Sequence, residues 1–268
     1  MVERPAVADV AFSVFTKHWK AVTLGRLSEV VRGMGFEGVE LPVRPGFQVV
    51  PERAGRDLPV AARKLADAGV PIRSVASAAD ESTIMACADA GVPLLRIMAP
   101  IRTEESYAAA EERYRREFDA LLPVLDRTGV TLGVQNHAGR EVANAIGLRS
   151  LIGHHDPRHV AAVWDAGHEA LAGNEPELAI DIVWPHLRLV NLKNAIWLQT
   201  AEAGAASAEW SAYWTAGRLG LSPWPRVAAE LRRRGYAGTV CLTGEYSGAV
   251  SVERQAAEDL AFARTLFA

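Results

Sequence analysis

The fold is decided by the segment Val130-Thr-Leu-Gly-Val-Gln-Asn-His137 and by three later segments of the same kind. The other three are Val160-Ala-Ala-Val-Trp-Asp-Ala-Gly-His168, Leu187-Arg-Leu-Val-Asn-Leu-Lys-Asn194 and Thr239-Val-Cys-Leu-Thr-Gly-Glu245. Each begins with an apolar run typical of a strand buried on both faces of a parallel sheet. Each ends in polar residues, and an α/β barrel places its chemistry at the C-terminal ends of its strands.

The rest of the chain repeats one unit, an amphipathic helix that stops at a glycine and is followed by an apolar strand. Residues 24–34 form the first predicted helix, which Thr23 can cap and Gly35 can end. A longer helix is predicted from near Thr103 to Gly129. With residues 12–15 as the first strand, eight strands alternate with helices. This alternation predicts an α/β fold, a (β/α)8 TIM barrel in which residues 1–268 form a single domain.

Composition excludes some classes of partner. The chain has 268 residues and a formal net charge of −3, so no basic surface is expected for nucleic acid. The first nine residues lack the apolar core of a signal peptide, and no run reaches membrane-spanning length. We therefore expect a soluble cytoplasmic protein with a small-molecule substrate and no membrane partner. The oligomeric state stays open, a homo-oligomer included.

Oxygen-bearing side chains at the four strand ends predict a metal site. They belong to Gln135, Asp165, Asn191 and Glu245. Carboxylate and amide oxygens suit Mg²⁺ or Mn²⁺ better than Zn²⁺, and two carboxylates match a divalent charge. The alternative is that these side chains cap neighbouring helices and loops.

Three further groups near these strand ends are candidate acids, bases or anion contacts. His137 lies two residues after Gln135 and His168 three residues after Asp165. Lys193 follows Asn191 and can hold an anionic or enolate oxygen. The alternative is a hydrogen-bonded structural role for both histidines and a solvated loop position for the lysine.

Four residues are candidate substrate contacts. Glu40 and Arg96 are charged residues in predicted strands, so each either reaches the substrate or belongs to an internal ion pair. Trp19 and Trp197 follow predicted strands on the catalytic side, where they can stack on a sugar, although packing is the commoner role. Residues 195–221 are expected to be a long irregular lid or interface, because few long connections in compact domains lack a function.

The chain resembles the xylose isomerase-like superfamily of sugar phosphate isomerases and epimerases. Inosose dehydratases, hydroxypyruvate isomerases and endonuclease IV are relatives in that superfamily. The resemblance spans nearly the whole chain. The motifs that carry it are Gly35-Phe-Glu-Gly-Val-Glu-Leu41, Gln135-Asn-His137, Asp165-Ala-Gly-His168, Asn191-Leu-Lys-Asn194 and Gly235-Tyr-Ala-Gly with Glu245.

The resemblance implies a metal held by Glu, Asp, His and Glu, with the two glutamates also able to act as an acid–base pair. This chain has Gln135 and Asn191 at two of those positions, and Asn194 replaces the usual Asp. The amide of Asn191 has a counterpart in hydroxypyruvate isomerases. Gln135 can coordinate through its oxygen but cannot take a proton near neutral pH. Two opposed glutamates are therefore not available for proton transfer.

We expect an isomerase or epimerase that acts on a small polyhydroxylated carbonyl compound. A divalent ion would polarise the substrate oxygen, and Glu245 would be the general base. Dehydration or β-elimination on a keto-sugar or related secondary metabolite is a second possibility. A third is a non-catalytic barrel with a decayed metal site.

Overall fold

Among the described residues, eight parallel strands close into a barrel, in the order β1-β10-β7-β6-β5-β4-β3-β2. The computed structural model describes residues 10–202, 204–248 and 251–268. The nine N-terminal residues considered above for a signal peptide lie outside this range. The barrel strands are β1 (Ala11–Phe15), β2 (Val39–Pro42), β3 (Ile72–Ala76), β4 (Leu94–Met98), β5 (Thr131–Gln135), β6 (Val160–Asp165), β7 (Leu187–Leu192) and β10 (Thr239–Leu242).

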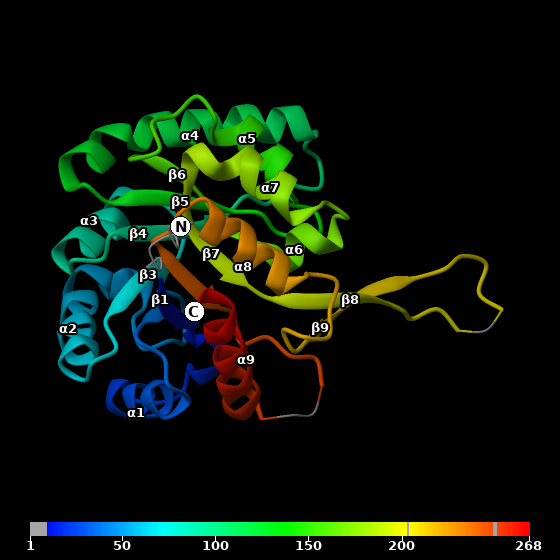
Figure 1. Cartoon of the computed structure of the whole chain (residues 1–268). Helices are drawn as coiled ribbons and strands as arrows, with labels where there is room; N and C mark the ends of the chain where they lie inside the picture. Colours follow the sequence, from blue (N-terminus) through cyan, green and yellow to red (C-terminus); the bar gives the residue numbers. More distant parts are fainter. Residues whose placement is uncertain (1–9, 203, 249–250) are drawn as a thin grey trace, which may run out of the picture.

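Helices surround the barrel on its outer side, as Figure 1 shows, and this confirms the predicted (β/α)8 fold. The α-helices are α1 (Leu24–Met34), α2 (Ala54–Asp67), α3 (Glu81–Asp89), α4 (Tyr107–Thr128), α5 (Ala145–Ile152), α6 (Ala166–Leu171), α7 (Pro176–Val183), α8 (Trp224–Arg233) and α9 (Val252–Phe267). Short 3-10 helices are η1 (Thr16–Trp19), η2 (Pro51–Arg53) and η3 (Trp184–His186). No helix in the described part of the chain has the length and apolar character needed to cross a membrane.

Helix ends follow the capping signals of the sequence, with one shift. The side chain of Thr23 accepts a hydrogen bond from the Arg26 N–H at the start of α1, and Gly35 ends that helix with a φ of 91°. The prediction that the long helix begins near Thr103 was wrong by about one turn. Ser106 caps α4, because its side chain accepts from the Ala109 N–H.

Inside the barrel, a small apolar layer lies below the mouth. It consists of Phe15, Ala76, Leu94, Val163, Leu189 and Cys241. Gly133 of β5 faces this layer, and a Cβ there would lie 2.6 Å from Val163 Cγ2 and 3.0 Å from Leu94 Cδ1. The strands around β5 can therefore pack this closely only because residue 133 has no side chain.

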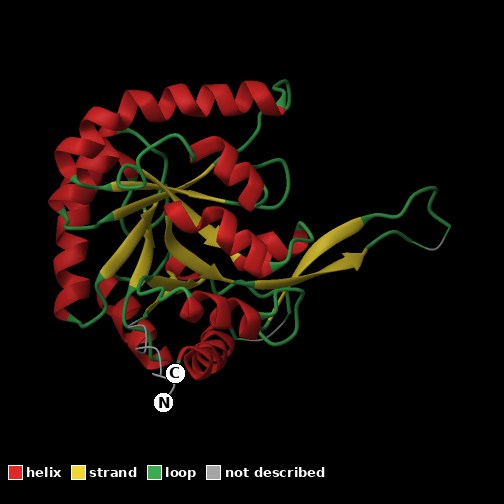
Figure 2. Ribbon diagram, turned by 45° about the horizontal axis from the view of Figure 1, so that its top comes forward, coloured by secondary structure: helices red, strands yellow, loops and turns green. Residues whose placement is uncertain are grey.

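The prediction that residues 195–221 are irregular was wrong. Strands β8 (Asn194–Gln199) and β9 (Trp210–Thr215) pair antiparallel over six residue pairs, from Asn194 with Thr215 to Gln199 with Trp210. This hairpin leaves the barrel between β7 and α8 and projects away from it, as Figure 2 shows.

Candidate active site

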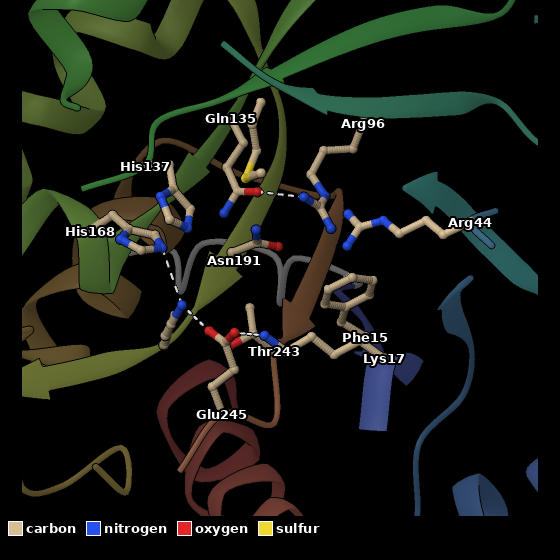
Figure 3. A pocket seen from close by; sticks show the side chains of 12 residues that line it. Phe15, Lys17, Arg44, Arg96, Gln135, His137, His168, Asn191, Thr243 and Glu245 are labelled. Carbon is tan, nitrogen blue, oxygen red and sulfur yellow. Dashed lines mark hydrogen bonds and ion pairs between the residues drawn. The ribbon is translucent and has the colours of Figure 1, made fainter. Parts of the chain in front are cut away.

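A pocket opens where the barrel strands end. Its volume is about 130 Å³, close to that of an engineered cavity that holds benzene, so it suits a small ligand. Every barrel strand except β3 contributes to it, either from its last residues or from the segment that follows. The lining residues are Phe15, Lys17, Arg44, Arg96, Met98, Gln135, His137, His168, Asn191, Lys193, Thr243 and Glu245, most of which are labelled in Figure 3.

Arg96 lies at the wall of this pocket and is held from behind by Glu40. The guanidinium donates from Nε to Glu40 Oε1 at 2.9 Å and from Nη2 to Glu40 Oε2 at 2.7 Å. Glu40 is fully buried, and Ser74 Oγ also donates to it. Of the two roles considered for Glu40, the structure has the internal ion pair. A bidentate pair of this kind fixes the direction of the guanidinium.

Gln135 continues the network from Arg96 to Asp165. Arg96 Nη1 donates to Gln135 Oε1 at 2.7 Å, and Gln135 Nε2 donates to Asp165 Oδ2 at 2.8 Å. The other carboxylate oxygen of Asp165 accepts from the N–H groups of Gly167 and His168 and caps α6. Burial raises the pKa of Asp165 above its ordinary value. The amide orientation is fixed by its partners, because a flip would place N–H against guanidinium and oxygen against carboxylate.

Glu245 lies between two lysines at the mouth. Its carboxylate forms ion pairs with Lys17 through Oε1 and with Lys193 through Oε2. Figure 3 shows Glu245 beside Lys17. Burial, with further contributions from Arg96 and Arg44, lowers the pKa of Lys17 to about 8. The mouth therefore holds a carboxylate whose two oxygens each face an ammonium group.

The rings of His137 and His168 lie with their centroids 3.9 Å apart and their planes tilted by 39°, and the two rings have opposite tautomers. His168 Nδ1 accepts from the Ala138 N–H at 3.1 Å, so its ring proton lies on Nε2. His137 Nδ1 donates to the Ala138 carbonyl at 2.8 Å, which leaves Nε2 as the acceptor of a neutral ring. Burial lowers the pKa of His168 to about 2 and also lowers the pKa of His137, so both rings are neutral at pH 7.

Asn191, near the end of β7, and Lys193, directly after that strand, form one wall of the pocket. Lys193 Nζ lies 3.1 Å from His168 Nε2 and 3.5 Å from the centroid of the Trp214 ring, which is a cation–π contact. Asn191 is 1% exposed, and among the described residues neither of its amide atoms has a hydrogen-bond partner. A buried amide without partners in a pocket wall is placed to bind a ligand.

The four predicted metal ligands do not fit a divalent ion in this arrangement. The oxygens of Gln135 and Asp165 already accept from a guanidinium or from N–H donors, and Glu245 faces two ammonium groups, which repel a cation. Within the part of the chain that the structure describes, no three histidine, cysteine, aspartate or glutamate side chains gather around one point. The Mg²⁺ or Mn²⁺ site stays a prediction that this donor set does not favour.

Two predicted substrate contacts lie elsewhere. Trp19 is buried outside the pocket lining, and its Nε1 donates to Glu253 Oε1 at 2.8 Å. Trp197 is on the projecting hairpin, where its Nε1 donates to the Leu171 carbonyl at 3.1 Å. Both side chains therefore have structural partners and lie outside the pocket lining, and their stacking on a sugar stays a prediction that this arrangement does not favour.

The sequence reasoning missed two cations that line the pocket. Lys17 follows β1 and Arg44 follows β2, so both obey the same strand-end pattern that selected the other site residues. With Arg96 they surround the Phe15 ring, at 5.9, 5.7 and 4.7 Å from its centroid. Applying the pattern to the first two strands would have found them.

Solved structures similar to this one have the same fold at low sequence identity. L-ribulose 3-epimerase has a TM-score of 0.73 and 15% identity, and the match covers 96% of this chain and 94% of that one. The 3-keto-D-glucoside 4-epimerase YcjR of E. coli has a TM-score of 0.71 and 15% identity, and the match covers 96% of this chain and 99% of that one. AsbF of Bacillus anthracis, a probable 3-DHS dehydratase, has a TM-score of 0.68 and 15% identity, with 94% of this chain and 98% of that one covered.

Sequence comparison places the chain more directly. No curated protein matches it in sequence. The model of the xylose isomerase-like TIM barrel family matches residues 29–266, which is most of the chain and includes every residue of the pocket except Phe15 and Lys17. The chain therefore belongs to the xylose isomerase-like TIM barrel family.

Proposed function

We propose that this protein is an isomerase or epimerase. It would remove a proton from the carbon next to a carbonyl group in a small polyhydroxylated compound and return a proton to the substrate. The observation that carries the proposal is the position of Glu245, the carboxylate that lines the pocket. Its two lysine partners, Lys17 and Lys193, are donors that can transfer their hydrogen bonds to an oxygen of the substrate. Glu245 is then the general base.

The neighbouring neutral imidazoles supply complementary groups. His168 presents Nε2–H, a donor for a carbonyl or hydroxyl oxygen. His137 has Nε2 as a hydrogen-bond acceptor, which suits a substrate hydroxyl group. A neutral donor beside the base favours enolate formation, because it stabilises the charge that develops on oxygen.

Among the described residues that line the pocket, Glu245 is the one carboxylate, so a carboxylate base is present on one side of the pocket. Gln135 stands where the family resemblance implies a second glutamate, and both polar atoms of its amide already have partners in Arg96 and Asp165. A mechanism with two opposed carboxylates is therefore not proposed. An isomerase that returns the proton from the same base on the same face fits the site better than an epimerase, which must deliver the proton to the opposite face.

A lyase is the second candidate, and one observation favours it. Lys193 and His168 bring two donors beside Glu245, so a leaving hydroxyl group can be protonated close to the base that removes the proton. One solved structure of the same fold is a probable dehydratase. The non-catalytic barrel fits less well, because a scaffold needs no carboxylate paired with two lysines inside a pocket.

Exchange of substrate hydrogen with solvent deuterium tests the function. Candidate ketoses and keto acids are incubated with the protein in D₂O, and NMR follows loss of the C–H signal next to the carbonyl. The variants Glu245→Gln and His168→Ala should each slow exchange on the order of 10² or more per folded molecule. The control Glu258→Gln changes an exposed glutamate of α9 and should leave the rate unchanged. Wild-type exchange in Glu245→Gln would end the one-base proposal.

A further inference from the structure

The pocket is rich in positive charge at the place where the family resemblance implies ligands for a cation. Four cationic side chains line it, those of Lys17, Arg44, Arg96 and Lys193. Three carboxylates lie in or behind its wall, those of Glu40, Asp165 and Glu245. The balance is positive before any ligand enters, so a divalent cation would meet net repulsion and an anion net attraction.

We propose that Lys193 and the Nε2–H of His168 take the place of the divalent ion, and that the pocket binds a small oxyanion, a carboxylate or phosphate group, without metal. Their nitrogen atoms lie 3.1 Å apart. Because His168 Nδ1 accepts from a backbone N–H, the Nε2 atom carries a proton and cannot accept from an ammonium group. Two donors that cannot satisfy each other converge on the same space, where one ligand oxygen satisfies both.

The opposite wall offers a second set of donors. Arg44 and Arg96 both lie against the Phe15 ring, which is 5.7 and 4.7 Å from their guanidinium carbons. Arg96 is held by Glu40 and cannot turn away, whereas Arg44 has no ion pair among the described residues. A planar guanidinium is well matched to a carboxylate or phosphate.

Asn191 gives the independent sign that a polar ligand belongs here. Its amide is buried, lines the pocket and has no partner among the described residues for either atom. Figure 3 shows it between the histidine side and the arginine side of the pocket. A ligand that bears hydroxyl groups beside its anionic group satisfies both the donor and the acceptor of this amide. The inference rests on the proposed function for the identity of the site and adds the class of its substrate.

Binding can be measured without catalysis. Protein treated with EDTA is titrated calorimetrically at low ionic strength with malonate, with inorganic phosphate and with neutral glycerol. We expect malonate or phosphate to bind and glycerol not to bind, and the stronger of the two anions identifies the anionic group. Lys193→Met and Arg44→Gln should each weaken binding about tenfold or more, since each removes a hydrogen bond to a charged group. The control Lys64→Met, an exposed lysine of α2, should not.

Circular dichroism checks that each variant is folded. If Lys193→Met does not fold, Arg44→Gln, on the opposite wall of the pocket, still tests the inference. Electron paramagnetic resonance of Mn²⁺ measures metal binding to the same protein, and we expect no binding at micromolar Mn²⁺. The inference is overturned if the anions bind only when Mn²⁺ is present, or if they bind both variants as tightly as the wild type. Neither outcome depends on the deuterium exchange that tests the proposed function, so the two can fail separately.

Discussion

At the scale of single residues, Gln135 joins the two sides of the mouth at a position where the family resemblance implies a glutamate. Its amide accepts from Arg96 and donates to Asp165, so it joins a cation to a carboxylate. A glutamate could accept from Arg96 but could not donate to Asp165 without a proton. Glutamine is therefore better suited than glutamate to a position between the guanidinium of Arg96 and the carboxylate of Asp165.

The variant Gln135→Glu tests this account. At pH 8 it should lower the free energy of unfolding by about 1–3 kcal/mol, because two buried carboxylates then face each other. At pH 5 the loss should be smaller, since a proton shared by the pair removes the repulsion. Urea unfolding at both pH values measures the difference, with the exposed Gln199→Glu as control. Full recovery in millimolar Mg²⁺ would instead show that the added carboxylate completes a metal site.

Glu141, in the loop after β5, gives a pH-dependent contribution to stability. Burial raises the pKa of its carboxyl from 4.5 to about 7. The folded state therefore holds this proton when the unfolded state has lost it, and stability falls as the pH rises from about 4.5 to about 7.

Replacing the carboxyl of Glu141 with an amide should remove the cost of holding a buried charge at high pH. Glu141→Gln should raise the free energy of unfolding at pH 8 by about 1 kcal/mol, a value reduced for partial exposure to solvent, and should leave it unchanged at pH 4. Thermal unfolding at the two pH values is the measurement. An equal gain at both would mean that charge is not the cause.

At the scale of elements, strand ends were the informative part of the sequence. Gln135, Asp165, Asn191 and Glu245 could be assigned to one end of the barrel because the strands are parallel. Their partners could not be predicted, since the pairing of Glu245 with Lys17 joins the two ends of the chain. Sequence pattern reports which face a residue is on, and side-chain pairing depends on packing between distant segments.

The hairpin shows a second limit of the sequence. Its strands bury little apolar surface, and Trp210 and Trp197 are exposed at 56% and 43%, so the usual alternation of buried and exposed residues is weak. At its base, Trp214 covers Lys193 and lies against His168 at a centroid distance of 5.1 Å. The part of the hairpin that affects the site is therefore the end of β9 next to the barrel, where Trp214 lies.

Two tryptophans of β9 make a matched pair for testing this role. Trp214→Leu should weaken malonate binding about threefold to tenfold, because the cation–π contact that holds Lys193 is lost. Trp210→Leu, at the far end of the same strand, should leave the affinity unchanged. Calorimetric titration gives both constants. If the two variants lose affinity equally, the effect comes from the hairpin as a whole and not from the contact with Lys193.

At the scale of the whole molecule, stability and chemistry occupy different levels of the barrel. The apolar layer that includes Leu94 and Val163 closes the barrel interior, and the charged groups lie above it at the strand ends. Gly133 belongs to the lower level. A change there should alter stability and leave ligand binding largely as it was.

Gly133→Ala should lower the free energy of unfolding by about 1–3 kcal/mol, since its Cβ would lie within 3.0 Å of Leu94 and Val163 side chains. Gly55→Ala, in helix α2 with nothing within 4 Å of the added Cβ, should raise it by about 0.4–1 kcal/mol. Urea unfolding compares the two. A stable Gly133→Ala variant would show that the interior layer can relax.

The hairpin also has a consequence for how the chain can be recombined. Its first and last residues, Asn194 and Thr215, are paired, so the inserted segment leaves and returns at one point of the barrel. Asn194 fastens that point, because its side chain bonds to Gly217 and to Ser222. We therefore expect that residues beyond the pair Trp197 and Ala212 can be replaced by a short turn or by the loop of another barrel, because Trp214 and the strands that carry the site would then stay in place.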